Sequence, residues 1–337
     1  MSVTLLFGDA HFQNPTFDFA TDKILKRLFI EQIWPIARER KVKRVVQVGD
    51  FTNDKKQINK QTSHIINECF TKPAIDLGLE VILICGNHDA YFRDRNEVNS
   101  LHSLFERTGF KIVDTEVLKQ GNSVYIPWGF NPKQYPAQYA FGHFEINGFE
   151  YQKGVVSNKG NRIDEFDFFD FAYVGHFHRK SIKKNIMYLG SLIALDFGET
   201  DTEHGFYLFD DETSKIEFIK SKFELFKKIN YPDDCEKVKD YNFFNKAVSI
   251  VVTKKEDENA YKQFLDAIYK QLPIAVKILS LEGELQKIME LDQVDGVENI
   301  LALSKRYIEK MELQKPIENK TLYELFERTH QEAVANG

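Results

Sequence analysis

The stretch VILICGNHDA, residues 81–90, joins an apolar run to three consecutive polar side chains. Residues 81–85 are apolar over strand length and Gly86 ends the run, which predicts a buried β-strand. Asn87, His88 and Asp89 follow at the end of that strand, and such side chains bind metal ions or take part in proton transfer. Side chains held at the end of a rigid element can be placed accurately, so this pattern predicts a functional site.

The same pattern, an apolar strand that ends in glycine and then a residue able to bind metal, recurs at four other places. They are Gly8-Asp9-Ala10-His11, Gly49-Asp50, Gly142-His143 and Gly175-His176-Phe177-His178. Because loops at the carboxyl ends of strands in an open α/β sheet converge on one crevice, these residues are expected to meet. Asp9 and His11 are two residues apart, as are His176 and His178, so each pair points the same way on extended backbone. Each pair can therefore share one ion, and Asp50 is free to bridge two.

Each of these strings is weak evidence when taken alone. A Gly-Asp pair after a strand is often only a turn, and a single Gly-His is more often a core or surface histidine than a ligand. Five such strings in order, each at a strand end, favour one shared site over five unrelated strand ends. Oxygen and imidazole ligands without sulfur suit Mn²⁺, Fe or Zn²⁺ in a hydrolytic centre better than a structural zinc.

The composition predicts a soluble protein of the cytoplasm, with no membrane partner. The chain has 337 residues, 42% of them hydrophobic, and it contains neither an apolar run of about 18 residues that could span a bilayer nor a signal-peptide pattern at its start. Three cysteines without CxxC spacing predict neither a disulfide framework nor a thiolate zinc site. A net charge of −6 argues against a protein that coats nucleic acid by bulk charge, so any site for a polyanion must be local.

The order of predicted elements changes along the chain. Over roughly the first 115 residues, strands alternate with helices near 22–40 and 62–77, which is the rhythm of a sheet with crossover helices. Short strands dominate from about 120 to 220 and predict a second sheet packed on the first. A β-α-β unit follows at about 247–281 and is interpreted as a small separate domain. From about 284 the spacing is helical, and a capping box at 321–324 opens a last helix.

The ordered strings D-x-H, GD, GNHD, GH and GHxH resemble the signature of the calcineurin-like metallophosphoesterases over about residues 3–190. Within that superfamily, IPW at 126–128, GHFEINGF at 142–149, GHFH at 175–178 and YLGS at 188–191 resemble the SbcD-type nucleases. This group includes the meiotic recombination eleven protein and phage recombination nuclease subunits. The resemblance implies an α/β fold, a four-layer α/β/β/α sandwich with a small β-α-β capping domain and a C-terminal helical tail.

The same resemblance implies three domains with distinct tasks. Residues 1–220 would form the metallophosphoesterase nuclease domain, residues 221–283 a capping domain that contacts DNA, and residues 284–337 a helical tail that binds an ATPase. The implied partner is an SbcC-type, SMC-like ABC ATPase, and the chain itself would be a homodimer. The implied activity is Mn²⁺-dependent DNA cleavage, exonucleolytic at duplex ends and endonucleolytic on single strands or hairpins, in repair, recombination or replication.

The resemblance also implies a role for each matched residue around two Mn²⁺ ions, with Mg²⁺, Fe or Zn²⁺ as alternatives. One ion would be held by Asp9, His11 and His178 and the other by Asn87, His143 and His176, with Asp50 bridging both. His88 would be the catalytic histidine, which hydrogen-bonds the scissile phosphate and protonates the leaving oxygen. Asp89 would orient that imidazole or a neighbouring ligand. Two departures from many relatives are Phe12-Gln13 in place of Leu-Gly, and Asn53 in place of a histidine.

Candidate DNA contacts lie on the loops that carry the motifs. They are Asn53, Lys55, Lys56, Arg93, Arg95 and Lys180. Ordinary solvated charge explains the lysines and arginines equally well. Two other functions stay open: a phosphatase or phosphodiesterase of the same superfamily that acts on a non-DNA phosphoester, and a non-catalytic scaffold with a relic site.

Overall fold

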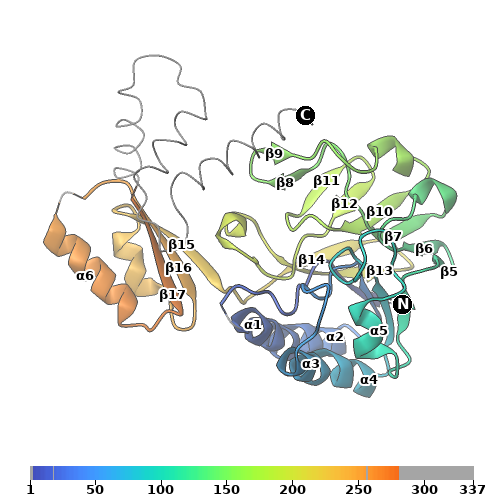
Figure 1. Cartoon of the computed structure of the whole chain (residues 1–337), viewed down its shortest axis with the longest axis horizontal. Helices are drawn as coiled ribbons and strands as arrows, with labels where there is room; N and C mark the ends of the chain where they lie inside the picture. Colours follow the sequence, from blue (N-terminus) through green and yellow to red (C-terminus); the bar gives the residue numbers. More distant parts are fainter. Residues whose placement is uncertain (1–2, 18, 256, 281–337) are drawn as a thin grey trace, which may run out of the picture. The chain divides into compact units, whose positions relative to one another are not determined.

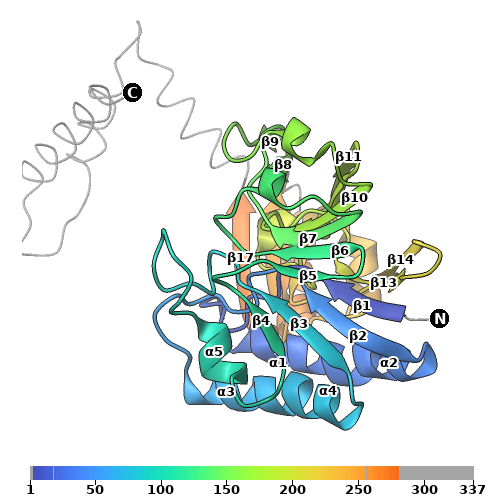
Figure 2. The same cartoon turned by 90° about the vertical axis from the view of Figure 1, so that its right-hand side faces the viewer.

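The computed structural model describes residues 3–17, 19–255 and 257–280, and most of its strands belong to two six-stranded sheets (Figures 1 and 2). The first sheet has the order β14 (Ile216–Lys220), β13 (Gly205–Asp210), β1 (Val3–Phe7), β2 (Val42–Gln47), β3 (Glu80–Ile84) and β4 (Lys111–Val113). Strands β1 to β4 are parallel, whereas β13 runs antiparallel to β1 and β14 antiparallel to β13. The alternation of strands and helices predicted for the first 115 residues is confirmed.

Each of the two long helices predicted near 22–40 and 62–77 contains a π-helical turn in its middle. The first consists of α1 (Ala20–Leu28), η1 (Phe29–Ile33) and α2 (Trp34–Glu39), and the second of α3 (Lys60–Ile66), η2 (Asn67–Thr71) and α4 (Lys72–Asp76). Both π turns come just before a proline, Pro35 or Pro73, which has no N–H for the regular hydrogen bond and whose ring needs space. The wider turn makes that space, so each helix continues past its proline. A shorter helix, α5 (Ser100–Phe105), precedes β4.

The second sheet has the order β11 (Ser181–Lys183), β12 (Ile186–Tyr188), β10 (Phe171–Gly175), β7 (Tyr139–His143), β6 (Ser123–Ile126) and β5 (Leu118–Gln120). The prediction that all strands from 120 to 220 form this sheet is wrong for β13 and β14. These two strands return to the first sheet because β1 offers a free edge, with Leu6 opposite Tyr207 in the register.

The two sheets pack face to face, and both faces of the first sheet are buried. Leu6 and Val46 point toward the second sheet, where they join a core with Phe141. Leu5 and Phe7, their neighbours in sequence, point to the opposite face and join a core with the helices. Successive side chains of a strand alternate between faces, so a strand covered on both sides is apolar throughout.

The outer face of the second sheet is also covered. Its core includes Phe144, Phe149, Phe166 and Phe169. Around it lie η3 (Pro132–Gln134), η4 (Ile163–Phe166) and a two-stranded sheet of β8 (Glu150–Gln152) and β9 (Val155–Val156). The described segments on this face are thus 3-10 turns, a hairpin and loops. An α/β fold with two packed sheets is what the structure shows.

The β-α-β unit predicted after residue 247 is confirmed. It consists of β16 (Ala247–Val252), α6 (Glu258–Tyr269) and β17 (Ala275–Ser280). A further strand, β15 (Phe226–Tyr231), pairs parallel with β16. The 3-10 turn η6 (Cys235–Asp240) lies between β15 and β16 in the sequence. Asp257 caps α6, because its Oδ1 accepts the N–H groups of Asn259 and Ala260. The unit has its own core around Ile250 and Phe264.

Two groups of predictions are not decided by the fold. The boundaries of the three expected domains stay predictions, and the tail at 284–337, with its expected helices and capping box, lies outside the described residues. Among the helices that the structure describes, none has the length and apolar character needed to cross a bilayer.

Candidate metal centre

The five strand-end strings meet where both large sheets present the carboxyl ends of their strands. The first sheet supplies the residues after β1, β2 and β3, and the second supplies those at the ends of β7 and β10. Two glycines allow the loops to approach closely. A Cβ on Gly86 would lie 2.2 Å from Asp50 Oδ1, and a Cβ on Gly49 would lie 2.2 Å from His143 Nδ1, so only glycine fits at either position.

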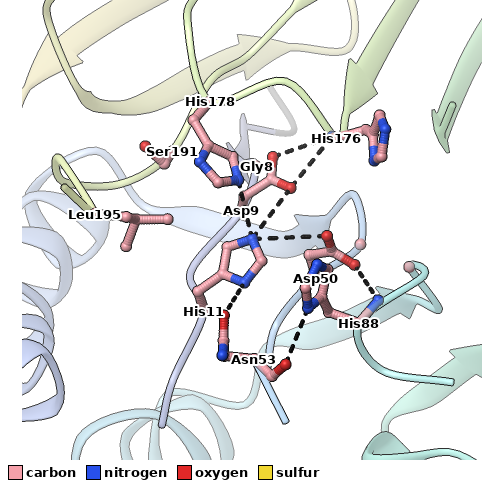
Figure 3. Close-up of polar contacts among 12 residues, drawn as sticks. Gly8, Asp9, His11, Asp50, Asn53, His88, His176, His178, Ser191 and Leu195 are labelled. Carbon is pink, nitrogen blue, oxygen red and sulfur yellow. Dashed lines mark hydrogen bonds and ion pairs between the residues drawn. The ribbon is translucent and has the colours of Figure 1, made fainter. Parts of the chain in front are cut away.

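The first candidate group joins Asp9, His11 and His178, whose ligand atoms lie within 4.8 Å of one another (Figure 3). The Nε2 atoms of His11 and His178 are 3.0 Å apart. The other ring nitrogen of each histidine is held: Nδ1 of His11 lies 3.1 Å from Asn53 Oδ1, and Nδ1 of His178 lies 2.6 Å from Glu199 Oε1. Because these oxygens accept the Nδ1 protons, the two Nε2 atoms face each other as candidate ligand atoms.

The two facing nitrogens require a positive charge between them. Burial opposes protonation of His178, but the Glu199 carboxylate outweighs it and raises the pKa of His178 to about 9. Burial, with His178 alongside, lowers the pKa of His11 well below its usual range. A proton can therefore occupy this position, and a metal ion would replace it. Two nitrogen ligands about 2.1 Å from an ion and at right angles are about 3.0 Å apart, so the spacing fits a metal.

The second candidate group joins Asp50, His143 and His176. The prediction that His176 and His178 share one ion is wrong, because the backbone at His176 has a φ of 104° and is not extended, so the two rings enter different groups. His143 donates its Nδ1–H to the Val48 carbonyl at 2.9 Å, which leaves Nε2 free to bind a metal. Oδ1 of Asn87 lies 3.0 Å from His143 Nε2 and 2.9 Å from His176 Nδ1. The structure thus places the amide oxygen of Asn87 beside the same group, as a fourth candidate ligand.

Asp50 lies between the two groups. Its Oδ2 is 3.3 Å from His143 Nε2 and 3.6 Å from His11 Nε2, whereas its Oδ1 accepts the backbone N–H of His88 at 2.8 Å. Burial acts to raise the pKa of Asp50, but His143 and His11 outweigh it and hold that pKa well below its usual range. The carboxylate is therefore ionised and directs one oxygen at both groups, which is the geometry that a bridging ligand needs.

The donor atoms and the burial of both groups fit divalent cations. Asp9 and Asp50 are shielded from solvent, and burial raises the pKa of Asp9 to about 6. Two buried carboxylates so close together are costly unless cations compensate them. Neither group includes a cysteine, so the set suits Mn²⁺, Fe or Zn²⁺ in a catalytic centre better than a structural zinc.

His88 lies beside the two groups without joining either. Its Nδ1–H donates to the Asn53 carbonyl at 2.9 Å, and its ring stands edge-on to that of His11 with 4.9 Å between centroids. Nε2 is then the atom left for a substrate, and His88 lines a cavity of about 360 Å³ with residues of both groups. Asn53, predicted as a DNA contact, holds two histidines, one by its carbonyl and one by its amide oxygen.

Asp89 is expected to orient either His88 or a neighbouring ligand, and its contacts favour the second role, because they hold the loops that carry ligands. The buried carboxylate accepts the N–H groups of Gly86 at 3.0 Å, Phe51 at 3.3 Å and Thr52 at 2.9 Å. Burial raises the pKa of Asp89 to about 6, against the effect of these donors. Asp89 therefore joins the loop after β3 to the loop after β2, and both loops carry predicted ligands.

Glu199 is a residue of the site that sequence reasoning missed. It ends the 3-10 turn η5 (Phe197–Glu199), bonds His178 through Oε1 and accepts the Leu195 N–H through Oε2 at 2.8 Å. A carboxylate behind a metal-binding histidine fixes the orientation of the ring and raises its basicity. Asp196 gives a recognisable N-cap signal for η5. No local pattern, however, links Glu199 to a histidine 21 residues earlier.

The cations predicted to contact DNA differ in their partners. They are Lys55, Lys56, Arg93, Arg95 and Lys180. Arg95 pairs with Glu97 at 3.3 Å, and Lys180 pairs with Glu203 at 2.5 Å. The other three are exposed and form no ion pair with another residue in the part of the chain described here. Their contact with nucleic acid stays a prediction.

Fold and site together define an α/β protein with a candidate two-metal centre at its strand ends. No protein-family model matches the chain. The chain is similar to exonuclease subunit 1 of Enterobacteria phage T4, with 28% identity over 278 residues that cover 78% of this chain and 79% of the relative. That relative is, by its name, one subunit of an exonuclease.

Proposed function

We propose that this chain is a two-metal DNA nuclease of the calcineurin-like metallophosphoesterase superfamily, of SbcD type. The observation that carries the proposal is the pair of adjacent Asp/His groups, with one Asp50 oxygen directed at both. The similarity to a phage exonuclease subunit supports the choice of DNA as substrate. The two packed sheets and the helical layer support the superfamily, whose sandwich has four layers.

The residues around the centre perform separable tasks. Two divalent cations bound there would supply positive charge against the phosphate oxygens and make a nucleophile available at neutral pH. Asn53, Val48 and Glu199 each hold one imidazole by its Nδ1–H, so that Nε2 points inward. His88 keeps its own Nε2 toward the cavity, where it can hydrogen-bond the scissile phosphate and protonate the leaving sugar oxygen. Such proton transfer contributes roughly 10²- to 10⁴-fold in rate.

We propose Mn²⁺ as the metal, exonuclease work at duplex ends and endonuclease work on single strands or hairpins. We further propose that residues 221–283 cap the DNA and that residues 284–337 bind an SMC-like ABC ATPase. A homodimer and an intracellular location complete this part of the proposal.

The test compares the native chain with His88→Ala on linear duplex and hairpin DNA in Mn²⁺ or Mg²⁺. His64→Ala is the matched control, since the side chain of His64 is 67% exposed and lies outside the centre. The expected result is unchanged metal content in both variants, with cleavage lost roughly 10²- to 10⁴-fold only in His88→Ala. Full cleavage by His88→Ala would remove this histidine from the mechanism. A native chain that hydrolyses small phosphomonoesters but leaves DNA intact would point to a phosphatase.

A further inference from the structure

A short hairpin forms one wall of the cavity beside the candidate metal centre. Strands β8 and β9 pair antiparallel, and Tyr151 and Gln152 on β8 line the cavity together with residues of both metal groups. Tyr151 is 46% exposed. A large aromatic ring left open to solvent at the edge of a polar site is informative, because such rings contribute most when they pack against another surface.

The hairpin presents this ring from a fixed base. The N–H of Ser157 donates to the Phe149 carbonyl at 2.8 Å and closes the hairpin. Phe149 is fully buried, with its ring 4.8 Å from that of Tyr188. The Tyr151 ring itself lies against Phe177, with 5.8 Å between centroids. Tyr151 is thus a flat surface held in place before any ligand arrives.

The charges on this wall disfavour a phosphate. Asp196 and Glu199 line the same cavity and carry carboxylates. Arg179 also lines it, but two carboxylates engage its guanidinium, the nearer being Asp201 at 2.6 Å. A phosphate would therefore lie toward the metal groups, and a neutral, flat group would fit against the hairpin.

We propose that Tyr151 stacks on a nucleobase of the strand being cleaved and that Gln152 faces the edge of the same base. This inference rests on the proposed nuclease function and adds to it the group that holds the substrate on its non-phosphate side. The amide of Gln152 can both donate and accept, so it suits the edge of any base. Stacking is equally tolerant, because every base has a π-face, so the wall binds DNA with little sequence preference.

The test uses a single-stranded oligonucleotide in which one nucleotide is replaced by a tetrahydrofuran residue that lacks the base. Cleavage at each phosphodiester is compared with that in the unmodified oligonucleotide, in Mn²⁺. The native chain is expected to cleave a bond next to the missing base about 5- to 150-fold more slowly, which is the value of one base–aromatic stack. Tyr151→Ala is expected to cleave the two oligonucleotides at equal rates. Its KM for the unmodified oligonucleotide is expected to exceed that of the native chain by the same factor of about 5- to 150-fold, with kcat retained.

Two further variants separate stacking from a structural role. Tyr151→Phe and Tyr151→Trp keep a ring and are expected to retain the native KM and the sensitivity to the missing base. Phe168→Ala is the matched control, because Phe168 is 39% exposed and precedes the start of β10, at the end of that strand opposite His176. It is expected to behave as the native chain.

Cleavage of the unmodified oligonucleotide separates the nuclease activity from the stacking of Tyr151. A native chain that cleaves neither oligonucleotide in Mn²⁺ would overturn the nuclease proposal and the stacking with it. A native chain that cleaves both at equal rates would overturn the stacking alone. Loss of bound Mn²⁺ in Tyr151→Ala would likewise overturn it, because the ring would then support the metal groups rather than a base.

Discussion

Replacement of Glu199 tests whether this carboxylate positions a metal-binding imidazole. The 2.6 Å bond from His178 Nδ1 to Glu199 Oε1 is partly buried, with the two side chains 25% and 14% exposed, so solvent screens it only in part. Removal of such a partner behind a metal ligand weakens metal binding by about 10- to 100-fold, or about 1.4–2.7 kcal/mol. A hydrogen bond to a charged group is worth about 1.5–3 kcal/mol, and this range overlaps the loss expected for metal binding. Glu199→Gln keeps an acceptor for His178, so its loss of metal affinity is expected near the low end of this range. Glu199→Ala removes the acceptor, so its loss is expected near the high end.

The assay is calorimetric titration of each folded variant with Mn²⁺. One of the two sites is expected to weaken and the other to keep its affinity. Glu203→Gln is the matched control, because Glu203 lies four residues along the same segment but pairs at the surface with Lys180. Glu199 also accepts the Leu195 N–H, so thermal unfolding is followed alongside. Native affinity at both sites in Glu199→Ala would refute the reasoning.

Three further changes probe the loops and the first sheet. Asp89→Ala leaves several buried N–H groups without an acceptor and is expected to lower the free energy of unfolding by about 3 kcal/mol or more in urea titration; a loss below 1 kcal/mol would contradict this. Gly86→Ala places a Cβ 2.2 Å from Asp50 Oδ1 and should abolish Mn²⁺ binding in calorimetry, whereas Gly121→Ala, with open space around it, should bind normally. Burial opposes ionisation of Glu80, but two cations and an amide lower its pKa to about 2. The stability that ionised Glu80 gives to the folded protein is therefore fully present above pH 4.5 and is lost as the pH falls toward 2. Glu80→Gln should be less stable than the native chain by about 1 kcal/mol at pH 6 and as stable as the native chain near pH 2. A difference that does not change with pH would contradict that assignment.

The ligand residues could be predicted from sequence because strand ends are a strong constraint. Parallel strands share one edge, so Asp9, Asp50 and Asn87 must lie near one another once β1, β2 and β3 are recognised. Glycine before each ligand marks the close approach of the loops. The same reasoning reached His143 and His176 at the ends of β7 and β10, since the second sheet presents its strand ends at the same place.

The supporting contacts could not be predicted in the same way. Glu199 reaches His178 from a 3-10 turn, and Asn53 uses its own backbone carbonyl to hold His88, which no side-chain pattern reveals. Asp89 follows His88 in sequence, yet its side chain turns to the neighbouring loop because buried N–H groups there need an acceptor. The return of β13 to the first sheet depends on the free edge of β1, a property of the assembled sheet.

The pairing of β13 with β1 determines when the candidate metal centre can be completed as the chain leaves the ribosome. β1 is the first strand made, but its outer edge stays unpaired until β13 emerges about 200 residues later. The segment between β12 and β13 crosses the site on the way, and there the N–H of Leu192 donates to the Asp9 carbonyl. A nascent chain that ends before residue 199 lacks the Glu199 support of His178, and one that ends before β13 still lacks a closed first sheet, so both parts of the centre are completed late in the synthesis of the two-sheet body.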